Sequence, residues 1–95
     1  MSSGSRFRIA LTNAFKKDVK AAKRRGKNLD ALFAVISQLA AGAALPHRNR
    51  DHALSGNWRG TRECHIEPDW LLIYEKDAET SVLICVRTGT HSDLF

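Results

Sequence analysis

The second half of the chain holds most of the side chains that can transfer protons or bind phosphate. It contains three of the four histidines, His52, His65 and His91, together with Asp69 and Arg87. Histidine titrates near neutral pH and can act as acid or base, while arginine offers a planar fork of donors to phosphate oxygens. Attack of a ribose 2′-hydroxyl on its own phosphate needs a base, an acid and a cation. These residue types therefore suit metal-independent cleavage of RNA.

Strand alternation indicates which of these side chains can share a cleft. Successive strand residues face opposite sides of a sheet, so His65 faces away from Cys64. If the helices cover the face of Cys64 and Val86, then His65 and Arg87 both point to the open face. In this register Cys64 and Cys85 face opposite ways, and a disulfide between them would need a bulge.

A loop and the C-terminal tail are expected to complete the cleft. Residues 46–60 form a loop that is long for a small domain, and such loops tend to be functional; this one carries His52. The tail would add His91 and Phe95, whose ring can stack on an unpaired base. A zinc site built from three histidines and Asp69 is chemically possible, but the spacing follows no compact zinc motif. We expect no metal and no cofactor.

The rest of the pattern predicts an α+β domain that positions this cleft. Hydrophobic periodicity gives the order β-α-α-β-β-β, with a mainly antiparallel sheet packed on two helices. Strands are expected at residues 6–11, 61–66, 70–76 and 81–88, and helices at residues 14–25 and between a cap at Asn28 and a stop at Gly42.

Apolar spacing also predicts which side chains are buried. The first strand alternates, which predicts that Phe7, Ile9 and Leu11 face a core. On the second helix the apolar residues follow three/four spacing; they are Leu29, Leu32, Phe33, Ile36, Leu39 and Ala40.

Length, charge and cysteine content limit the possible class of protein. We expect residues 1–5 to be a flexible leader and residues 6–95 a single domain. No segment has the pattern of a signal peptide or a membrane span, so reduced cysteines and a cytoplasmic location are expected. The net charge of +5 suits a polyanionic partner.

The first predicted helix concentrates that positive charge. It carries a run of cations that we expect to contact RNA phosphates or the ribosome; they are Lys16, Lys17, Lys20, Lys23, Arg24 and Arg25. Trp70 is added to this set as an aromatic that could contact RNA or shape the pocket.

Three motifs in the second half resemble a known family. They are Asp51-His52-Ala53-Leu54-Ser55-Gly56 with Trp58, the run from Arg62 to Trp70, and Arg87-Thr88-Gly89-Thr90-His91 with Leu94-Phe95. Together they resemble the YafQ toxins of type II toxin–antitoxin systems, which belong to the RelE/ParE superfamily. The resemblance runs from about Phe7 to Phe95. Ala53 stands where many relatives have proline.

The resemblance implies a RelE-like microbial RNase fold and an mRNA endoribonuclease acting in the ribosomal A site. It implies a 2′,3′-cyclic phosphate product and neutralisation by an acidic, DinJ-like antitoxin. The family's catalytic set falls on His52, His65, Asp69, Arg87, His91 and Phe95.

The roles expected of this set leave one question open. His91 would protonate the leaving oxygen, Arg87 would stabilise the phosphorane, and Phe95 would pack on the substrate base. The base that takes the 2′-hydroxyl proton is one of His52, His65 and Asp69.

Two other functions fit the same fold class. One is a non-enzymatic, ParE-like toxin that binds a protein target such as DNA gyrase, and the other is a plain RNA-binding module. Neither needs three histidines converging on a cleft, so the histidines favour the ribonuclease.

Overall fold

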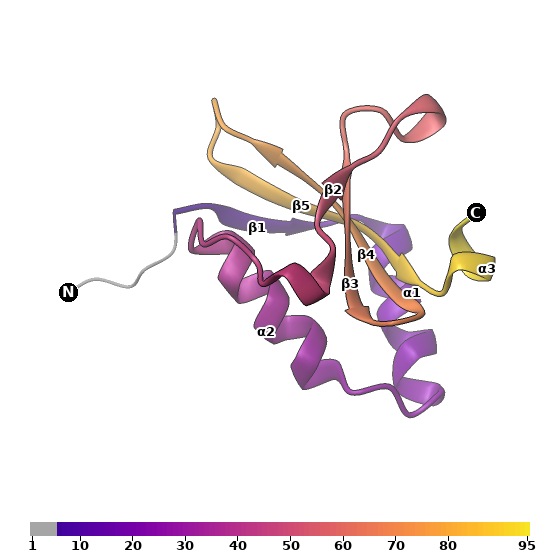
Figure 1. The fold of residues 1–95 in the computed structure, drawn as a ribbon. Helices are drawn as coiled ribbons and strands as arrows, with labels where there is room; N and C mark the ends of the chain where they lie inside the picture. Colours follow the sequence, from indigo (N-terminus) through magenta and orange to yellow (C-terminus); the bar gives the residue numbers. More distant parts are fainter. Residues whose placement is uncertain (1–5) are drawn as a thin grey trace.

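The computed structural model describes residues 6–95; the expected leader at residues 1–5 lies outside the described residues (Figure 1). The elements are, in chain order, β1 (Arg8–Leu11), α1 (Asn13–Arg24), α2 (Leu29–Ala40), η1 (His47–Asn49), β2 (His52–Ala53), η2 (Gly56–Trp58), β3 (Arg62–Glu67), β4 (Trp70–Asp77), β5 (Val82–Gly89) and α3 (His91–Leu94), where η denotes a 3₁₀ turn. The predicted α+β order is confirmed. The short strand β2, the two 3₁₀ turns and the helix α3 were not expected.

The described strands form one sheet in the order β1-β5-β4-β3-β2. β1 runs parallel to β5, and the other neighbours are antiparallel, so the sheet is mainly antiparallel, as predicted. A parallel pair needs a long crossover. Here the crossover is the whole of the chain between β1 and β5. In the sheet, β5 lies between β1 and the meander of β4, β3 and β2.

Both long helices begin at side-chain caps, and the cap of α2 at Asn28 is the one that the sequence predicts. Thr12 Oγ1 accepts a hydrogen bond from the Phe15 N–H, and Asn28 Oδ1 accepts one from the Ala31 N–H. The Thr12 hydroxyl also donates to the Val86 carbonyl at 2.7 Å. The start of α1 is thereby tied to the strand that leads to α3.

Helices α1 and α2 cover one face of the sheet and enclose the larger core with it. This core includes Trp70, Leu72, Tyr74, Leu83 and Cys85 from the strands. The predicted face of β5 is therefore wrong, because it is the Leu83–Cys85 side and not the Val86 side that meets the helices. Both sides of β5 are apolar, so composition did not distinguish them. A bulge then breaks the alternation, since Tyr74 pairs with Cys85 while Ile73 pairs with Arg87.

The two cysteines lie in this same core, which corrects the expectation that they face opposite ways. Cys64 and Cys85 are both buried and free. They belong to β3 and β5, which are separated by β4, so they are roughly 9–10 Å apart by strand spacing, beyond disulfide reach. Burial raises the pKa of the Cys64 thiol to about 12 and that of Cys85 to about 11.

Three apolar residues predicted to be buried are exposed. Ile9 and Leu11 are 49% and 43% exposed because β1 is the edge strand of the sheet. Phe33 is 46% exposed, while Val35 on the same helix is buried in the core. The predicted inward position of Phe33 is therefore wrong, and α2 is rotated so that Val35 faces the sheet.

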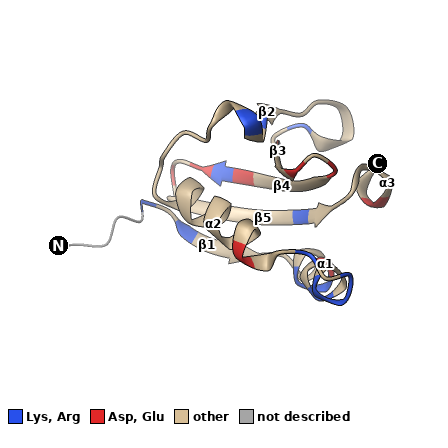
Figure 2. Cartoon of the chain, turned by 60° about the horizontal axis from the view of Figure 1, so that its bottom comes forward, with Lys and Arg blue, Asp and Glu red and all other residues tan. Residues whose placement is uncertain are grey.

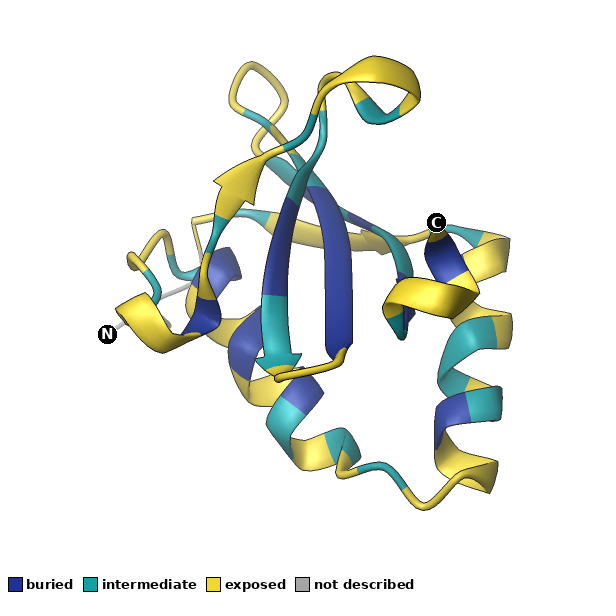
Figure 3. Cartoon of the chain, turned by 45° about the vertical axis from the view of Figure 1, so that its right-hand side comes forward, coloured by how far each residue is buried: buried dark blue, intermediate teal, exposed yellow. Residues whose placement is uncertain are grey.

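The opposite face of the sheet has a thinner cover. Leu71, Ile73 and Leu94 form a small cluster there, with Leu54, Trp58 and Val86 packed against it. Figure 3 shows β4 buried along most of its length, with exposed loops and α3 around it. Among residues 6–95, no helix is long and apolar enough to cross a membrane.

Candidate active site

His91 and Asp69 form a direct contact at the C-terminal end of β5. The Asp69 carboxylate oxygen Oδ1 lies 2.9 Å from His91 Nδ1 and accepts the His91 backbone N–H at 3.1 Å. These hydrogen bonds hold the pKa of Asp69 below its usual value. The carboxylate fixes the Nδ1–H tautomer, which leaves His91 Nε2 free. Both side chains are exposed, so Nε2 is available to a substrate.

A second group lies on β2 and β3, around a buried carboxylate. Glu63 Oε2 is 3.5 Å from His52 Nε2 and 3.6 Å from His65 Nε2. Its side chain is only 7% exposed. The sequence interpretation did not include Glu63 in the site. The signal was available, because Glu63 lies two positions before His65 on one strand and so faces the same side.

The tautomers of these two histidines follow from their other contacts. His52 Nδ1 lies 2.7 Å from the Arg50 carbonyl, and His65 Nδ1 lies 3.2 Å from the Pro68 carbonyl. A carbonyl only accepts, so Nδ1 carries the proton in both rings. Each Nε2 therefore faces the Glu63 carboxylate. The unprotonated nitrogen of either ring is a possible proton acceptor.

The loop that carries His52 is fixed by two side chains. Asp51 Oδ1 accepts hydrogen bonds from the Tyr74 hydroxyl at 2.6 Å and from Arg62 Nε at 3.1 Å. Buried Asn49 donates to the His65 carbonyl at 2.6 Å. The long loop predicted to form the roof of the cleft is therefore tied to β3 and β4 on both sides of Arg50.

Aromatic contacts connect the groups and define an edge. The His65 and His91 rings have centroids 5.8 Å apart, and Phe95 lies 6.3 Å from His91. Phe95 also packs edge-to-face on Trp58 at 5.8 Å and is 58% exposed. The structure thus brings His52, His65, Asp69, His91 and Phe95 into one chain of contacts, as the sequence predicts.

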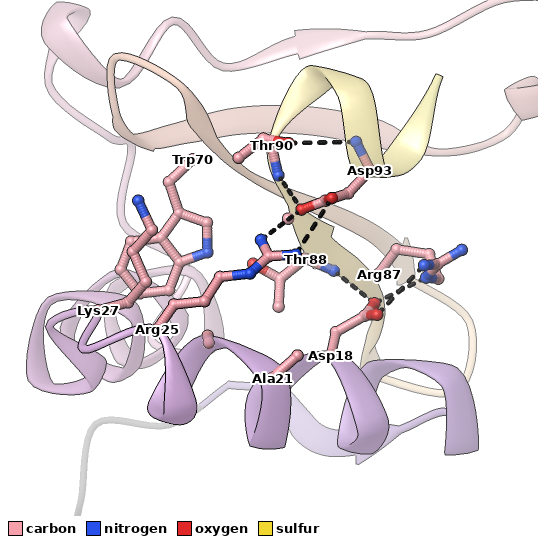
Figure 4. Close-up of a pocket in the computed structure, with 11 residues that line it drawn as sticks. Asp18, Ala21, Arg25, Lys27, Trp70, Arg87, Thr88, Thr90 and Asp93 are labelled. Carbon is pink, nitrogen blue, oxygen red and sulfur yellow. Dashed lines mark hydrogen bonds and ion pairs between the residues drawn. The ribbon is translucent and has the colours of Figure 1, made fainter.

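Arg87 makes its contacts elsewhere. Its Nε and Nη2 atoms donate to the Asp18 carboxylate on α1 at 2.7 and 3.1 Å (Figure 4). These bonds raise the pKa of the guanidinium above its ordinary value. Arg87 therefore lies against α1, where a pocket of about 220 Å³ is lined by Arg25, Trp70 and Asp93 among others. The sequence interpretation did not foresee Asp18 as its partner.

The residues predicted to contact RNA are all exposed except Trp70. Figure 2 shows α1 as the element richest in Lys and Arg, and all six of its predicted cations are exposed. Trp70 is only 1% exposed, so it cannot contact RNA in this conformation, and that expectation is wrong. The other expectation, that Trp70 shapes a pocket, matches its place in the wall of the pocket beside α1.

A metal ion could be held by part of the histidine group. Ligand atoms of Glu63, His65 and His91 lie within 4.8 Å of one another. A carboxylate and two imidazoles form a donor set that suits zinc or copper. Asp69 and the Pro68 carbonyl bond to the Nδ1 atoms of the two histidines, which is the outer-shell arrangement common for metal-bound histidine. This set differs from the one weighed from sequence, because Glu63 takes the place of His52 and Asp69.

Fold and site together place the chain among small α+β toxins with a RelE-like fold, and similarity to known proteins specifies the family. Residues 7–95 match the family model described as the bacterial toxin of type II toxin–antitoxin system, YafQ. The chain belongs to the YafQ family.

Individual relatives agree with this assignment over nearly the whole chain. The mRNA interferase toxin YafQ of Escherichia coli strain K12 is 40% identical over 88 residues, which cover 92% of this chain and 94% of the relative. The crystal structure of the E. coli DinJ-YafQ toxin-antitoxin complex matches with a TM-score of 0.86 and 38% identity over 95% of this chain and 98% of that chain. A metal-bound toxin from Helicobacter pylori matches with a TM-score of 0.88 and 37% identity over 94% and 99%.

Proposed function

We propose that this toxin is an mRNA interferase, an endoribonuclease that cuts transcripts on the translating ribosome and so inhibits translation. The observation that carries the proposal is the pair of separate proton-transfer groups, His91 with Asp69 and Glu63 with two histidines, on one side of the sheet. The name of the E. coli relative supports it. A non-enzymatic toxin would need neither group.

The chemistry divides between the two groups. The 2′-oxygen attacks the phosphorus as its proton passes to a base, the bond to the 5′-oxygen breaks, and His91, which starts the step with a proton on each ring nitrogen, gives its Nε2 proton to that leaving oxygen. Asp69 makes two bonds to His91, so its place in the mechanism is to orient the acid. The base is then His52 or His65, each supported by Glu63.

The remaining residues act on the substrate. Exposed Phe95 beside His91 packs on an unpaired base. Arg87 stabilises the phosphorane charge, and to reach it the guanidinium must exchange its two bonds to Asp18 for phosphate oxygens. No step needs a metal ion.

The partners of the proposal follow from charge and similarity. The basic face of α1 binds ribosomal RNA through phosphates, which makes the binding sensitive to salt. A cognate, DinJ-like acidic antitoxin neutralises the toxin, supported by the matching E. coli complex. Because its mRNA substrate lies on ribosomes, the toxin acts in the cytoplasm.

Primer extension on a reporter mRNA in translating and non-translating extracts tests the proposal. Wild-type toxin should give codon-phased cuts only during translation, and His91→Ala should reduce cleavage by about 10²–10⁴-fold through loss of the acid. His47→Ala is the matched control, since His47 is exposed and lies outside the histidine group. Full cleavage by the His91 variant, or arrest of growth without any cleavage, would reject the ribonuclease in favour of a binding toxin.

A further inference from the structure

The helix that carries His91 is too short to hold its own shape. α3 spans only His91–Leu94, and isolated helices shorter than about 12 residues are marginal in water. Its geometry must therefore come from contacts with the rest of the molecule. The position of His91 Nε2 depends on those contacts, because the His91 backbone is part of the helix.

Asp93 is the residue on which these contacts converge. Its carboxylate accepts the Thr90 N–H at 3.0 Å while Thr90 Oγ1 accepts the Asp93 N–H at 3.1 Å, which closes a capping box. The same carboxylate takes two hydrogen bonds from Arg25, at 2.7 and 3.3 Å. Gly89 makes room for it, since a Cβ there would lie 3.0 Å from Asp93 Cβ.

Arg25 comes from the C-terminal end of α1, 68 positions earlier in the chain. Figure 4 shows its side chain extending from α1 to α3, with Thr90 and Asp93 at the far end. About two turns earlier on the same helix, Asp18 binds Arg87 and accepts the Thr88 N–H at 3.1 Å. α1 thus holds both the end of β5 and the helix that follows it.

We propose that Arg25 and Asp93 are positioning residues for His91: their ion pair fixes α3 against α1 and sets the orientation of the catalytic imidazole. This inference rests on the proposed ribonuclease function. Among the described residues, neither side chain forms a hydrogen bond or ion pair with the His91 ring. Their effect on catalysis passes through the backbone of α3, whereas Asp69 acts on the ring directly.

The competing explanation is that Arg25 is simply one more cation for RNA. Arg24 provides a matched control, because it is the preceding residue, is also exposed and forms no ion pair among the described residues. Arg24→Gln and Arg25→Gln remove the same charge from the same end of α1. Loss of a phosphate contact raises KM in both variants, while loss of positioning lowers kcat in one of them.

The kinetic test compares these variants with Asp93→Asn and the Arg25→Gln/Asp93→Asn double variant. We expect the kcat of Arg25→Gln to be roughly tenfold lower than that of Arg24→Gln, a loss typical of small misplacement of a catalytic group. Arg25→Lys should recover part of the loss, and the double variant should be no slower than the worse single variant. Equal kcat in the two arginine variants, or additive losses in the double variant, would overturn the proposal.

A measurement that needs no cleavage separates this proposal from the proposed function. In NMR spectra of the full chain, Arg25→Gln should increase amide exchange at Leu94 and Phe95, whose N–H groups bond within α3, and should shift the His91 ring resonances. Arg24→Gln should do neither. If wild-type toxin cleaves no RNA, the ribonuclease assignment fails, but these spectra still decide whether Arg25 holds α3. Unchanged spectra in Arg25→Gln would reject the positioning role itself.

Discussion

The two faces of the sheet are made by the same strands and differ in what covers them. One face is sealed by α1 and α2, and its core includes Trp70, Leu72 and Tyr74. The other face is covered by Leu94 and by side chains of the loop before β3, around Leu71 and Ile73. The proton-transfer groups all lie outside the larger core. We infer that the helix-covered face supplies most of the stability, while the thinly covered face supports the site.

Adjacent residues of β4 face opposite sides of the sheet and allow each face to be tested by a single substitution. Leu71 and Leu72 are adjacent and both fully buried, Leu72 in the larger core and Leu71 in the smaller cluster with Leu94. Each change to alanine should cost about 2–5 kcal/mol in the free energy of unfolding. Leu71→Ala should also lower the cleavage rate per folded molecule, because it removes packing beneath α3. Urea unfolding and single-turnover cleavage measure the two effects. Equal cleavage losses in both variants would show that the two faces do not differ in their support of the site.

Added metal ions probe the ligand atoms on the thinly covered face. Zn²⁺ bound by Glu63, His65 and His91 would occupy nitrogens that the reaction needs. Cleavage should therefore fall at least severalfold and return when a zinc-selective chelator that leaves Mg²⁺ in place is added. The same chelator alone should leave wild-type cleavage intact. His47→Ala should remain as sensitive to Zn²⁺ as wild type. Stimulation of cleavage by Zn²⁺ would contradict the metal-free mechanism.

The attachment of α3 to α1 should appear in the pH dependence of stability. Hydrogen bonds from Arg25 and the Thr90 N–H hold the pKa of Asp93 well below its usual value. A depressed pKa contributes stability that is present above the unfolded value, about 3.9, and is lost as pH falls through the folded value. Thermal unfolding of wild type and Asp93→Asn from pH 7 to pH 2 should therefore differ most at neutral pH and converge at the acid end. A difference that stays constant with pH would contradict the ion pair.

The smallest effect concerns the thiols of the sealed face. Cys64 and Cys85 are buried, and burial raises the pKa of both, so neither forms a reactive thiolate at neutral pH. A thiol reagent should label neither in the native protein and both after denaturation. Rapid labelling of either cysteine in native protein would show that the helix layer opens readily.

Local signals predicted the scaffold well. The cap at Asn28 and the apolar periodicity located both long helices to within about a residue of their observed bounds, because capping and amphipathicity act within one or two turns. The expected strands match β3, β4 and β5 for the same reason. The histidine group was also foreseen, since the motifs that carry it are contiguous in sequence.

The errors arose where the outcome depends on distant partners. Val86 and Cys85 are both apolar, so only the packing of α1 and the bulge opposite Tyr74 decide which of them meets the helices. Arg25 and Asp93 are 68 positions apart, and nothing local pairs them. α3 did leave a signal, the Thr90 to Asp93 capping box, but a four-residue helix has too few residues to show periodicity.

The place of β5 in the sheet has a consequence for synthesis and folding. β1 pairs with β5, whose partners Val82–Cys85 emerge from the ribosome long after Arg8–Leu11. Contacts of such sequence separation form slowly. Until β5 arrives, β1 has no partner and the core beneath α1 and α2 stays open. A nascent chain that ends before Val82 therefore exposes apolar surface and lacks His91. The protein thus acquires its chemistry as one of the last steps of its own assembly, after nearly all of its message has been read.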